Sequence, residues 1–237
     1  MTAYELMIKT NRYIIKGGEL TDAHKANITG QLLAARSSQS EVQRFQRSMK
    51  DVVMYPSIYI PPYKGGEKYQ TVIPMSPKTH ILSANSYELE ILRLLCLFAS
   101  ENSEVRDMTG EAVARLKKSC FGYQSCGYGE CFESSIIVLR FVAAAAPDDM
   151  EWQKKQIDIF NSHFKERRRN AGVLHYYWLC LSELPFETAE PEILSHRENI
   201  LSRLAGNKTG LNENEIVVRH VMQNILARLP EQSLTAL

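Results

Sequence analysis

The sequence has no hydrophobic run long enough to cross a membrane. Its most apolar stretch, residues 135–146, is shorter than the roughly 20 residues that a membrane-spanning helix needs, and it contains Arg140. The sequence also lacks an excess of charge of either sign, because 28 lysines and arginines face 27 aspartates and glutamates. A net charge of +1 gives no overall attraction to nucleic acid or to an anionic membrane, which leaves only a local basic patch for such a partner.

Several familiar signals are missing as well. The sequence contains no phosphate-binding loop, dinucleotide-binding fingerprint, metalloprotease motif or protein kinase motif, and its first residues lack the basic and apolar regions of a secretory signal. The five cysteines are an odd number, and Cys96 and Cys180 lie in apolar helical patterns. This usage favours reduced thiols over a secreted disulfide framework. We therefore expect a cytoplasmic protein without a membrane partner.

Residues 1–50 have the pattern of three short helices. Apolar side chains over residues 3–15 recur at helical spacing. Thr21 is a suitable cap for a second helix, and the sequence Ser38-Gln-Ser-Glu41 is a capping box for a third. We expect an N-terminal group of modestly amphipathic helices.

Residues 51–82 differ from their surroundings in being rich in β-branched and aromatic side chains. Two strand-like runs flank Gly65-Gly66, which is typical of a β-hairpin. Several prolines exclude this segment from the middle of a sheet. We expect an inserted β-hairpin or extended arm that projects between helical blocks and serves as a connection, a lid or a dimerisation arm.

Residues 85–237 have a helical pattern almost throughout. A capping box at Asn85–Glu88 starts the first of these helices, and another at Asn212–Glu215 starts the last. The run 132–146 is apolar on nearly every side, so we expect it to be the buried central helix. At 237 residues the chain is long enough to bury a substantial core and is compatible with one compact unit.

A period accompanies these helices. Apolar helices end in Leu-Phe-Ala-Ser-Glu at 97–101, Ala-Ala-Ala-Pro-Asp at 144–148, Leu-Ser-Glu-Leu-Pro at 181–185 and Leu-Ala-Arg-Leu-Pro at 226–230. Helix pairs that recur roughly every 40 residues resemble HEAT and armadillo repeats over residues 85–230. The resemblance implies a stack of antiparallel helix pairs, and an irregular helical bundle is the alternative. The predicted fold class is mainly α with one inserted β-hairpin.

Cys120, Cys126 and Cys131 lie among glycines directly before the expected central helix. Three thiolates so close together could bind zinc, with His163 or His175 from a neighbouring helix as the fourth ligand. The spacing departs from the Cys-x2-Cys pattern of strong zinc motifs. The alternative is a set of reduced thiols that binds no metal.

Cys131 also has the position of a reactive thiol, because the N-terminus of a helix stabilises a thiolate. Gly129-Glu-Cys131 before an apolar helix, followed by His175-Tyr-Tyr-Trp178, resembles the cysteine site of transglutaminases, which implies Cys131 as nucleophile and His175 as its partner. The sequence departs from that family because the intervening segment is helical and no aspartate follows His175 at a suitable position. The competing interpretation, which we favour, makes His175 a core residue.

The densest basic run is Lys165-Glu-Arg-Arg-Arg169, at the end of an expected helix. Cations at this position complement the helix dipole, which gives the run a structural explanation. The alternative is a surface that contacts nucleic acid, in which stacked repeats bring the end of the preceding amphipathic helix nearby. The residues of this candidate surface are Lys117, Lys118, Lys165, Arg167, Arg168 and Arg169.

Tyr176, Tyr177 and Trp178 are consecutive on an expected helix, where no single face can bury all three. We expect at least one of them to lie in a groove or interface, and Tyr59 and Tyr63 of the arm are further binding candidates. Stacked helices also form concave surfaces. The sequence therefore favours a non-enzymatic module, without a cofactor, that binds a protein or peptide partner. Nucleic-acid binding and a cysteine-dependent enzyme or zinc site are the alternatives.

Overall fold

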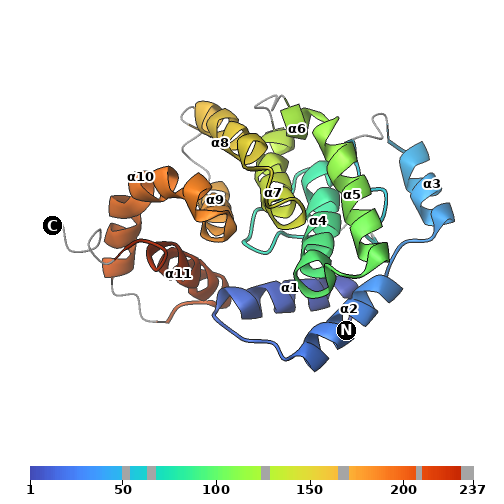
Figure 1. Cartoon of the computed structure of the whole chain (residues 1–237), viewed down its shortest axis with the longest axis horizontal. Coiled ribbons are helices and arrows are strands. Elements are labelled where there is room, and N and C mark those ends of the chain that lie inside the picture. Colours follow the sequence, from blue (N-terminus) through green and yellow to red (C-terminus); the bar gives the residue numbers. More distant parts are fainter. Residues whose placement is uncertain (50–53, 63–67, 124–128, 165–170, 207–209, 231–237) are drawn as a thin grey trace.

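The computed structural model describes residues 1–49, 54–62, 68–123, 129–164, 171–206 and 210–230, and their regular secondary structure is helical throughout. Figure 1 shows α4 and α7 side by side at the centre of the molecule. No helix within the described ranges combines the length and the apolarity that crossing a membrane requires. The helices are α1 (Ala3–Ile15), α2 (Asp22–Ala34), α3 (Gln39–Arg47), α4 (His80–Ala99), α5 (Ser103–Lys117), α6 (Cys120–Tyr123), α7 (Gly129–Ala145), α8 (Met150–Phe164), α9 (Ala171–Glu183), α10 (Phe186–Ala205) and α11 (Glu213–Leu226).

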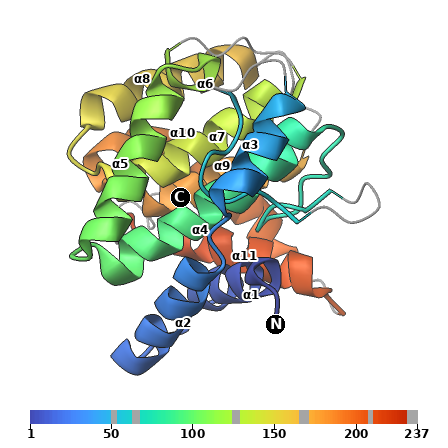
Figure 2. The same cartoon turned by 90° about the vertical axis from the view of Figure 1, so that its right-hand side faces the viewer.

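The three N-terminal helices are confirmed, together with the caps that begin two of them. The Thr21 side chain accepts a hydrogen bond from a backbone N–H in the first turn of α2. Ser38 and Glu41 form the predicted capping box at α3, in which each side chain accepts a backbone N–H of the other residue. Figures 1 and 2 show α1 and α2 lying across one end of α4, which both helices contact.

The predicted start of α4 at Asn85 is wrong, because this helix begins at His80. Thr79 is its N-cap and accepts a hydrogen bond from the backbone N–H of Ile81. Asn85 instead lies inside the helix, fully buried, and donates to the carbonyl of Met54 at 2.9 Å. The sequence pattern around Asn85 is therefore that of a helix cap, although this side chain bonds to a residue in another part of the fold.

The predicted β-hairpin is wrong for the described parts of residues 51–82, which contain no strand. Residues 54–62 and 68–79 run as extended or bent chain against the helices instead, and the predicted turn lies outside the described residues. Their apolar side chains enter the core, as Ile58 and Val72 do at 2% and 0% exposure. The described part of this arm therefore lies on the helical body and does not project from it.

Side chains take the place of a second strand for the backbone donors of this arm. The buried carboxylate of Glu88 accepts the N–H groups of Ser57 and Ile58, each at 2.8 Å, and the Ser83 hydroxyl accepts that of Tyr69 at 2.8 Å. A backbone N–H that is buried must find an acceptor. Because side chains of α4 supply these acceptors, the arm needs no second strand to pair with.

The buried central helix is confirmed as α7, whose side chains are buried almost continuously from Phe132 to Val142. It contacts α4, α5, α6, α8 and α9, which together surround it. Successive helices also contact each other in the pairs α4–α5, α7–α8 and α10–α11. This pairing is compatible with a helical-repeat arrangement.

The first and last described helices, α1 and α11, contact each other. Lys16 after α1 forms an ion pair with Glu213 at the start of α11, with 2.9 Å between Nζ and Oε1. Asn224 of α11 donates to the backbone carbonyl of Ile15 at 2.8 Å. These contacts bring α11 beside α1, and α11 also contacts α9 and α10.

Candidate functional site

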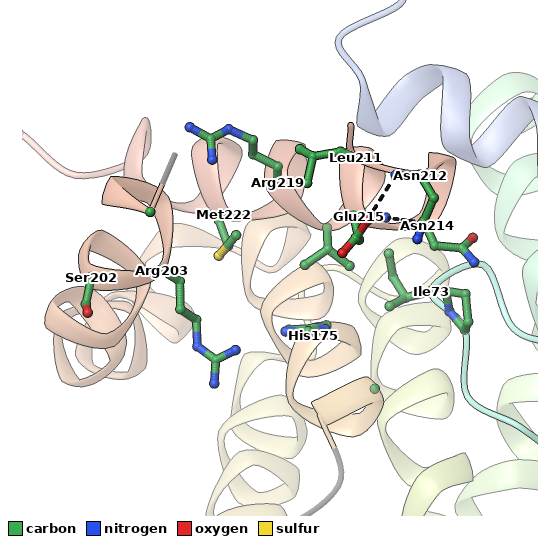
Figure 3. A pocket seen from close by; sticks show the side chains of 14 residues that line it. Ile73, His175, Ser202, Arg203, Leu211, Asn212, Asn214, Glu215, Arg219 and Met222 are labelled. Carbon is green, nitrogen blue, oxygen red and sulfur yellow. Dashed lines mark hydrogen bonds between the residues drawn. The ribbon is translucent and has the colours of Figure 1, made fainter. Parts of the chain in front are cut away.

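A cavity of about 560 Å³ lies where α9, α10 and α11 meet the extended segment at residues 73–74. In Figure 3 the side chains of Glu215 and Met222 on α11 point toward the part of α9 that carries His175, while Arg203 reaches in from α10. The cavity thus combines an apolar surface with a few polar groups, as small binding sites do. The apolar part of its described lining comprises Ile73, Pro74, Leu211, Val218 and Met222.

A second cavity, also of about 560 Å³, borders the first at Arg203, which lines both. It lies between the end of α8, the start of α9 and the middle of α10. Phe164 and Leu174 supply its apolar surface among the described residues, and the rest of that lining is polar.

One face of α10 connects the two cavities. Its lining residues recur in the pattern i, i+3, i+4, i+7, which places them on a single side of the helix. We call this surface, with the two cavities that it borders, the α10 groove. Its residues are Glu192, Ser195, His196, Asn199, Ser202 and Arg203 of α10, with Gly206, the C-cap of this helix.

Arg203 is held in place at the centre of the α10 groove. Its guanidinium lies over the ring of the buried Trp178, with 5.5 Å from Cζ to the ring centroid, and its Nε donates to the Asn199 side chain at 2.8 Å. None of the ion pairs among the described residues includes Arg203. The structure thus fixes a guanidinium whose charge has no carboxylate partner within the described chain.

Two histidines flank the same tryptophan, one in each cavity. The ring centroids of His175 and His196 lie 5.5 and 6.0 Å from that of Trp178. Burial, reinforced by the positive charge of Arg203, lowers the pKa of His175 to about 4. Burial also lowers the pKa of His196, and the nearby Glu192 carboxylate only partly opposes this effect. The fold therefore favours neutral imidazoles in the groove.

The remaining charged groups of the first cavity already have local roles. Glu215 accepts a hydrogen bond from the backbone N–H of Asn212 at 3.0 Å, in the predicted capping box of α11, which is confirmed. Arg219 donates to the backbone carbonyl of Leu204 at 3.2 Å, which ties α11 to the end of α10. Arg203 differs from these two residues because no described residue accepts a hydrogen bond from its terminal amino groups.

A second polar cluster lies in the core and is saturated. Arg140 donates two hydrogen bonds to Glu90, at 2.6 and 2.7 Å, and two to Glu183, at 2.7 and 2.8 Å. Arg93 forms a further ion pair with Glu183 at 2.6 Å, and the Tyr176 hydroxyl donates to Glu90. Two cations face two anions and are hydrogen-bonded to them, so this cluster is structural.

The expectation that one residue of the aromatic triplet is exposed was wrong, because Tyr176, Tyr177 and Trp178 are all fully buried. Each points to a different neighbour of α9. Tyr176 bonds to the cluster around Arg140, Tyr177 stacks on Phe160 of α8 at 4.4 Å, and Trp178 lies beneath Arg203 of α10. A helix that is covered on all sides buries consecutive aromatic residues.

Of the two predicted binding residues of the arm, the structure describes Tyr59 alone. Tyr59 is fully buried, and its hydroxyl donates to the backbone carbonyl of Leu32 at 3.1 Å. Tyr63 lies outside the described residues. The Tyr59 side chain therefore anchors the arm to α2 and is not accessible to a partner.

The structure places Cys120 in α6 and Cys131 in the first turn of α7, both partly buried, while Cys126 lies outside the described residues. Nowhere in the described chain do three His, Cys, Asp or Glu side chains gather as a metal site would require. His175 is half-buried at a cavity wall, where we expected a core residue, and Cys131 is not part of the described lining of that cavity. The structure therefore does not place the thiol of Cys131 in the cavity that His175 lines.

The candidate nucleic-acid surface is only partly described, because Lys165, Arg167, Arg168 and Arg169 lie outside the described residues. Lys118 is exposed at the end of α5. Lys117 forms an ion pair with Asp149, just before the N-terminal end of α8. The expected proximity of Lys117 to the basic run stays a prediction, because that run lies outside the described residues.

Comparison with known proteins gives no relative from which a function could be transferred: no family model fits this sequence, no curated protein matches it, and no solved structure matches it. The candidate site therefore depends on its own geometry. Sequence reasoning missed the groove face of α10, because polar residues at helical spacing are also the pattern of a face that meets only solvent.

Proposed function

We propose that this protein is a non-enzymatic interaction module that binds an extended segment of a protein partner in the α10 groove. The observation that carries the proposal is the continuous face of α10 that lines two adjacent cavities, with Arg203 between them. Concave sites with an apolar surface and a few placed polar groups are where proteins bind their ligands.

The size of the groove fits a short peptide segment. From Glu192 to Gly206 the α10 face is about 21 Å long at the usual rise of an α-helix. An extended chain advances about 3.3 Å per residue, so roughly six residues of a partner would cover this length. The apolar surface at Val218 and Met222 offers a place for one side chain of that segment.

The arrangement of the polar groups supports binding over catalysis. His175 is the only imidazole in the described lining of the first cavity, and Ser202 is the one hydroxyl or thiol residue in that lining. Figure 3 shows Ser202 on the far side of Arg203 from His175. A serine nucleophile needs a base within hydrogen-bond reach, and this arrangement does not provide one.

The proposal also includes the resemblance to HEAT and armadillo repeats. Successive helix pairs in contact, such as α7–α8 and α10–α11, support a short repeat stack. Solenoids of this kind use extended concave surfaces to bind other proteins. The α10 groove would be such a surface.

A selection from a library of random peptides displayed on phage tests the proposal. Enriched peptides are synthesised with a fluorescent label, and their affinity is measured by anisotropy against the full chain. The Ser195→Trp variant places a large side chain in the groove. We expect it to weaken binding at least about tenfold, which corresponds to about 1.4 kcal/mol.

The matched control is Leu194→Trp, the same bulky residue one position earlier on α10. Leu194 is exposed and is not part of the groove lining, so this variant should bind the peptides as the wild type does. Circular dichroism checks that both variants keep their helical content. Failure to enrich any peptide, or equal binding by both variants, would refute the proposed function.

A further inference from the structure

The contacts of the Arg203 guanidinium indicate which chemical groups the α10 groove can bind. Its guanidinium is fixed by stacking on Trp178 and by the hydrogen bond from Nε to Asn199. No described residue accepts a hydrogen bond from its two terminal amino groups, Nη1 and Nη2, so these contacts leave both for a ligand. A guanidinium presents such donors as a planar fork that matches the two oxygens of a carboxylate. Because the fork is already oriented, a ligand need not order it on binding.

The apolar surface lies close to this fork, within the same cavity. Met222 and Val218 of α11, with Ile73 of the extended segment, line the cavity that Arg203 also borders. Figure 3 shows Met222 extending from α11 and Arg203 extending from α10 beside it, with the guanidinium of Arg203 on the side away from α11. A ligand that satisfies both features carries an acidic group close to an apolar one.

We propose that the α10 groove recognises an acidic peptide segment, in which an aspartate or glutamate carboxylate binds the Nη1 and Nη2 groups of Arg203 and a neighbouring apolar side chain lies against Val218 and Met222. This inference rests on the proposed function, because it names the chemistry of the partner that the groove binds. It adds Arg203 as the residue that determines specificity.

The charges around the groove favour an acidic peptide over a nucleic acid. Glu192 lines one cavity and Glu215 the other, so that carboxylates stand on both sides of Arg203. A polyphosphate that follows the groove would meet these anions along its length. An isolated carboxylate needs only the fork of Arg203, which lies between them.

The test uses the peptides enriched by phage selection, each made also with its acidic residue replaced by the matching amide. On the wild type, we expect loss of the carboxylate to weaken binding about 10- to 100-fold, as for a hydrogen-bonded charged group. On Arg203→Gln, the acidic and amide forms should bind within about threefold of each other. Arg203→Lys keeps the charge without the fork, and should discriminate less than the wild type.

Arg219→Gln is the matched control, because Arg219 lines the same cavity but is committed to the carbonyl of Leu204. This variant should keep the preference for the acidic form. A tryptophan reporter adds an independent signal, since the chain has 2 tryptophans and Trp152→Phe leaves only Trp178, under the fork. Binding of the acidic peptide should change its emission, and the amide form should do so only at correspondingly higher concentration.

The outcomes separate the two proposals. Peptides that Ser195→Trp excludes, but that bind equally well as acid and amide, would refute carboxylate recognition and leave the groove as a binding site. Peptides that bind the Ser195→Trp variant as tightly as the wild type would refute the groove as the binding site. Displacement of the acidic peptide by a single-stranded oligonucleotide at equal concentration, lost in Arg203→Gln, would replace the peptide with a nucleic acid and overturn the inference.

Discussion

The buried cluster around Arg140 allows a quantitative test of how this fold is held together. The Arg140 side chain is 1% exposed and shares four charge-assisted hydrogen bonds with Glu90 and Glu183. Burial alone would lower the pKa of Arg140 and raise that of Glu183. The mutual charges outweigh burial, so that the pKa of Arg140 lies well above and that of Glu183 below the ordinary value.

The Arg140→Met variant removes one of the two cations and leaves both carboxylates in place. Glu183 keeps Arg93 as its ion-pair partner, whereas Glu90 loses its ion pair and keeps, among the described residues, the hydrogen bond from Tyr176 and the more distant charge of Arg93. An uncompensated buried charge of this kind costs about 3–5 kcal/mol. For a domain of this size, each kcal/mol lowers the melting temperature by about 2–4 °C, so we expect a decrease of roughly 6–20 °C.

The measurement is urea and thermal unfolding followed by circular dichroism. Arg106→Met serves as the control, because Arg106 is exposed and its ion pair with Glu101 is 4.0 Å long; its effect should stay within about 0.5 kcal/mol. The double variant Arg140→Met/Glu90→Gln leaves a neutral pair of Arg93 and Glu183. It should be less destabilised than the sum of the single variants by about 1–3 kcal/mol. A cost below about 1 kcal/mol for Arg140→Met, or strict additivity, would show that the cluster does not act as a charge-balanced unit.

Three further predictions concern the side chains of Glu130, His175 and Cys180. Glu130→Gln should cost about 1–3 kcal/mol and speed hydrogen exchange at the N–H of Leu82, because the buried carboxylate accepts backbone donors at the start of α4; unchanged exchange would contradict this. His175, whose pKa falls in the fold from 6.5 to about 4, should contribute stability above pH 6.5 that is lost as the pH falls toward 4; an NMR titration midpoint near 6.5 would contradict it. Cys180, fully buried with a raised pKa, should resist alkylation at neutral pH until the chain unfolds, and Cys96, with a pKa of about 11, should react slowly in the native state; rapid native alkylation of Cys180 would show that α9 opens.

Local signals in the sequence predicted the helices whose determinants lie within a few residues. The capping boxes at Ser38 and Asn212 are such signals, because cap and partner are three positions apart. The all-round apolar pattern of α7 likewise predicted its central place. Each of these features can be read without knowing which helices are neighbours.

The errors came from residues whose partners are distant in the sequence. The arm has the composition of a hairpin, but Glu88 of α4 takes the amides that a second strand would have bound. Asn85 has the pattern of a cap but bonds to Met54 across the fold. The polar face of α10 could not be distinguished from a solvent-exposed face, since only the positions of α8, α9 and α11 make it a groove.

The three aromatic residues of α9 connect the buried cluster to the groove. Tyr176 bonds to Glu90 within the cluster, and Trp178, two positions on, supports Arg203. Tyr177 fixes the same helix against α8 and donates to Glu192 of α10 at 2.9 Å. Because α9 is held on three sides, the wall of the groove is formed before any partner arrives. A preformed site binds without the cost of ordering its own side chains. Under the proposed function, discrimination among partners should therefore depend on the charge and shape of the peptide, with Arg203 as the group that binds its carboxylate.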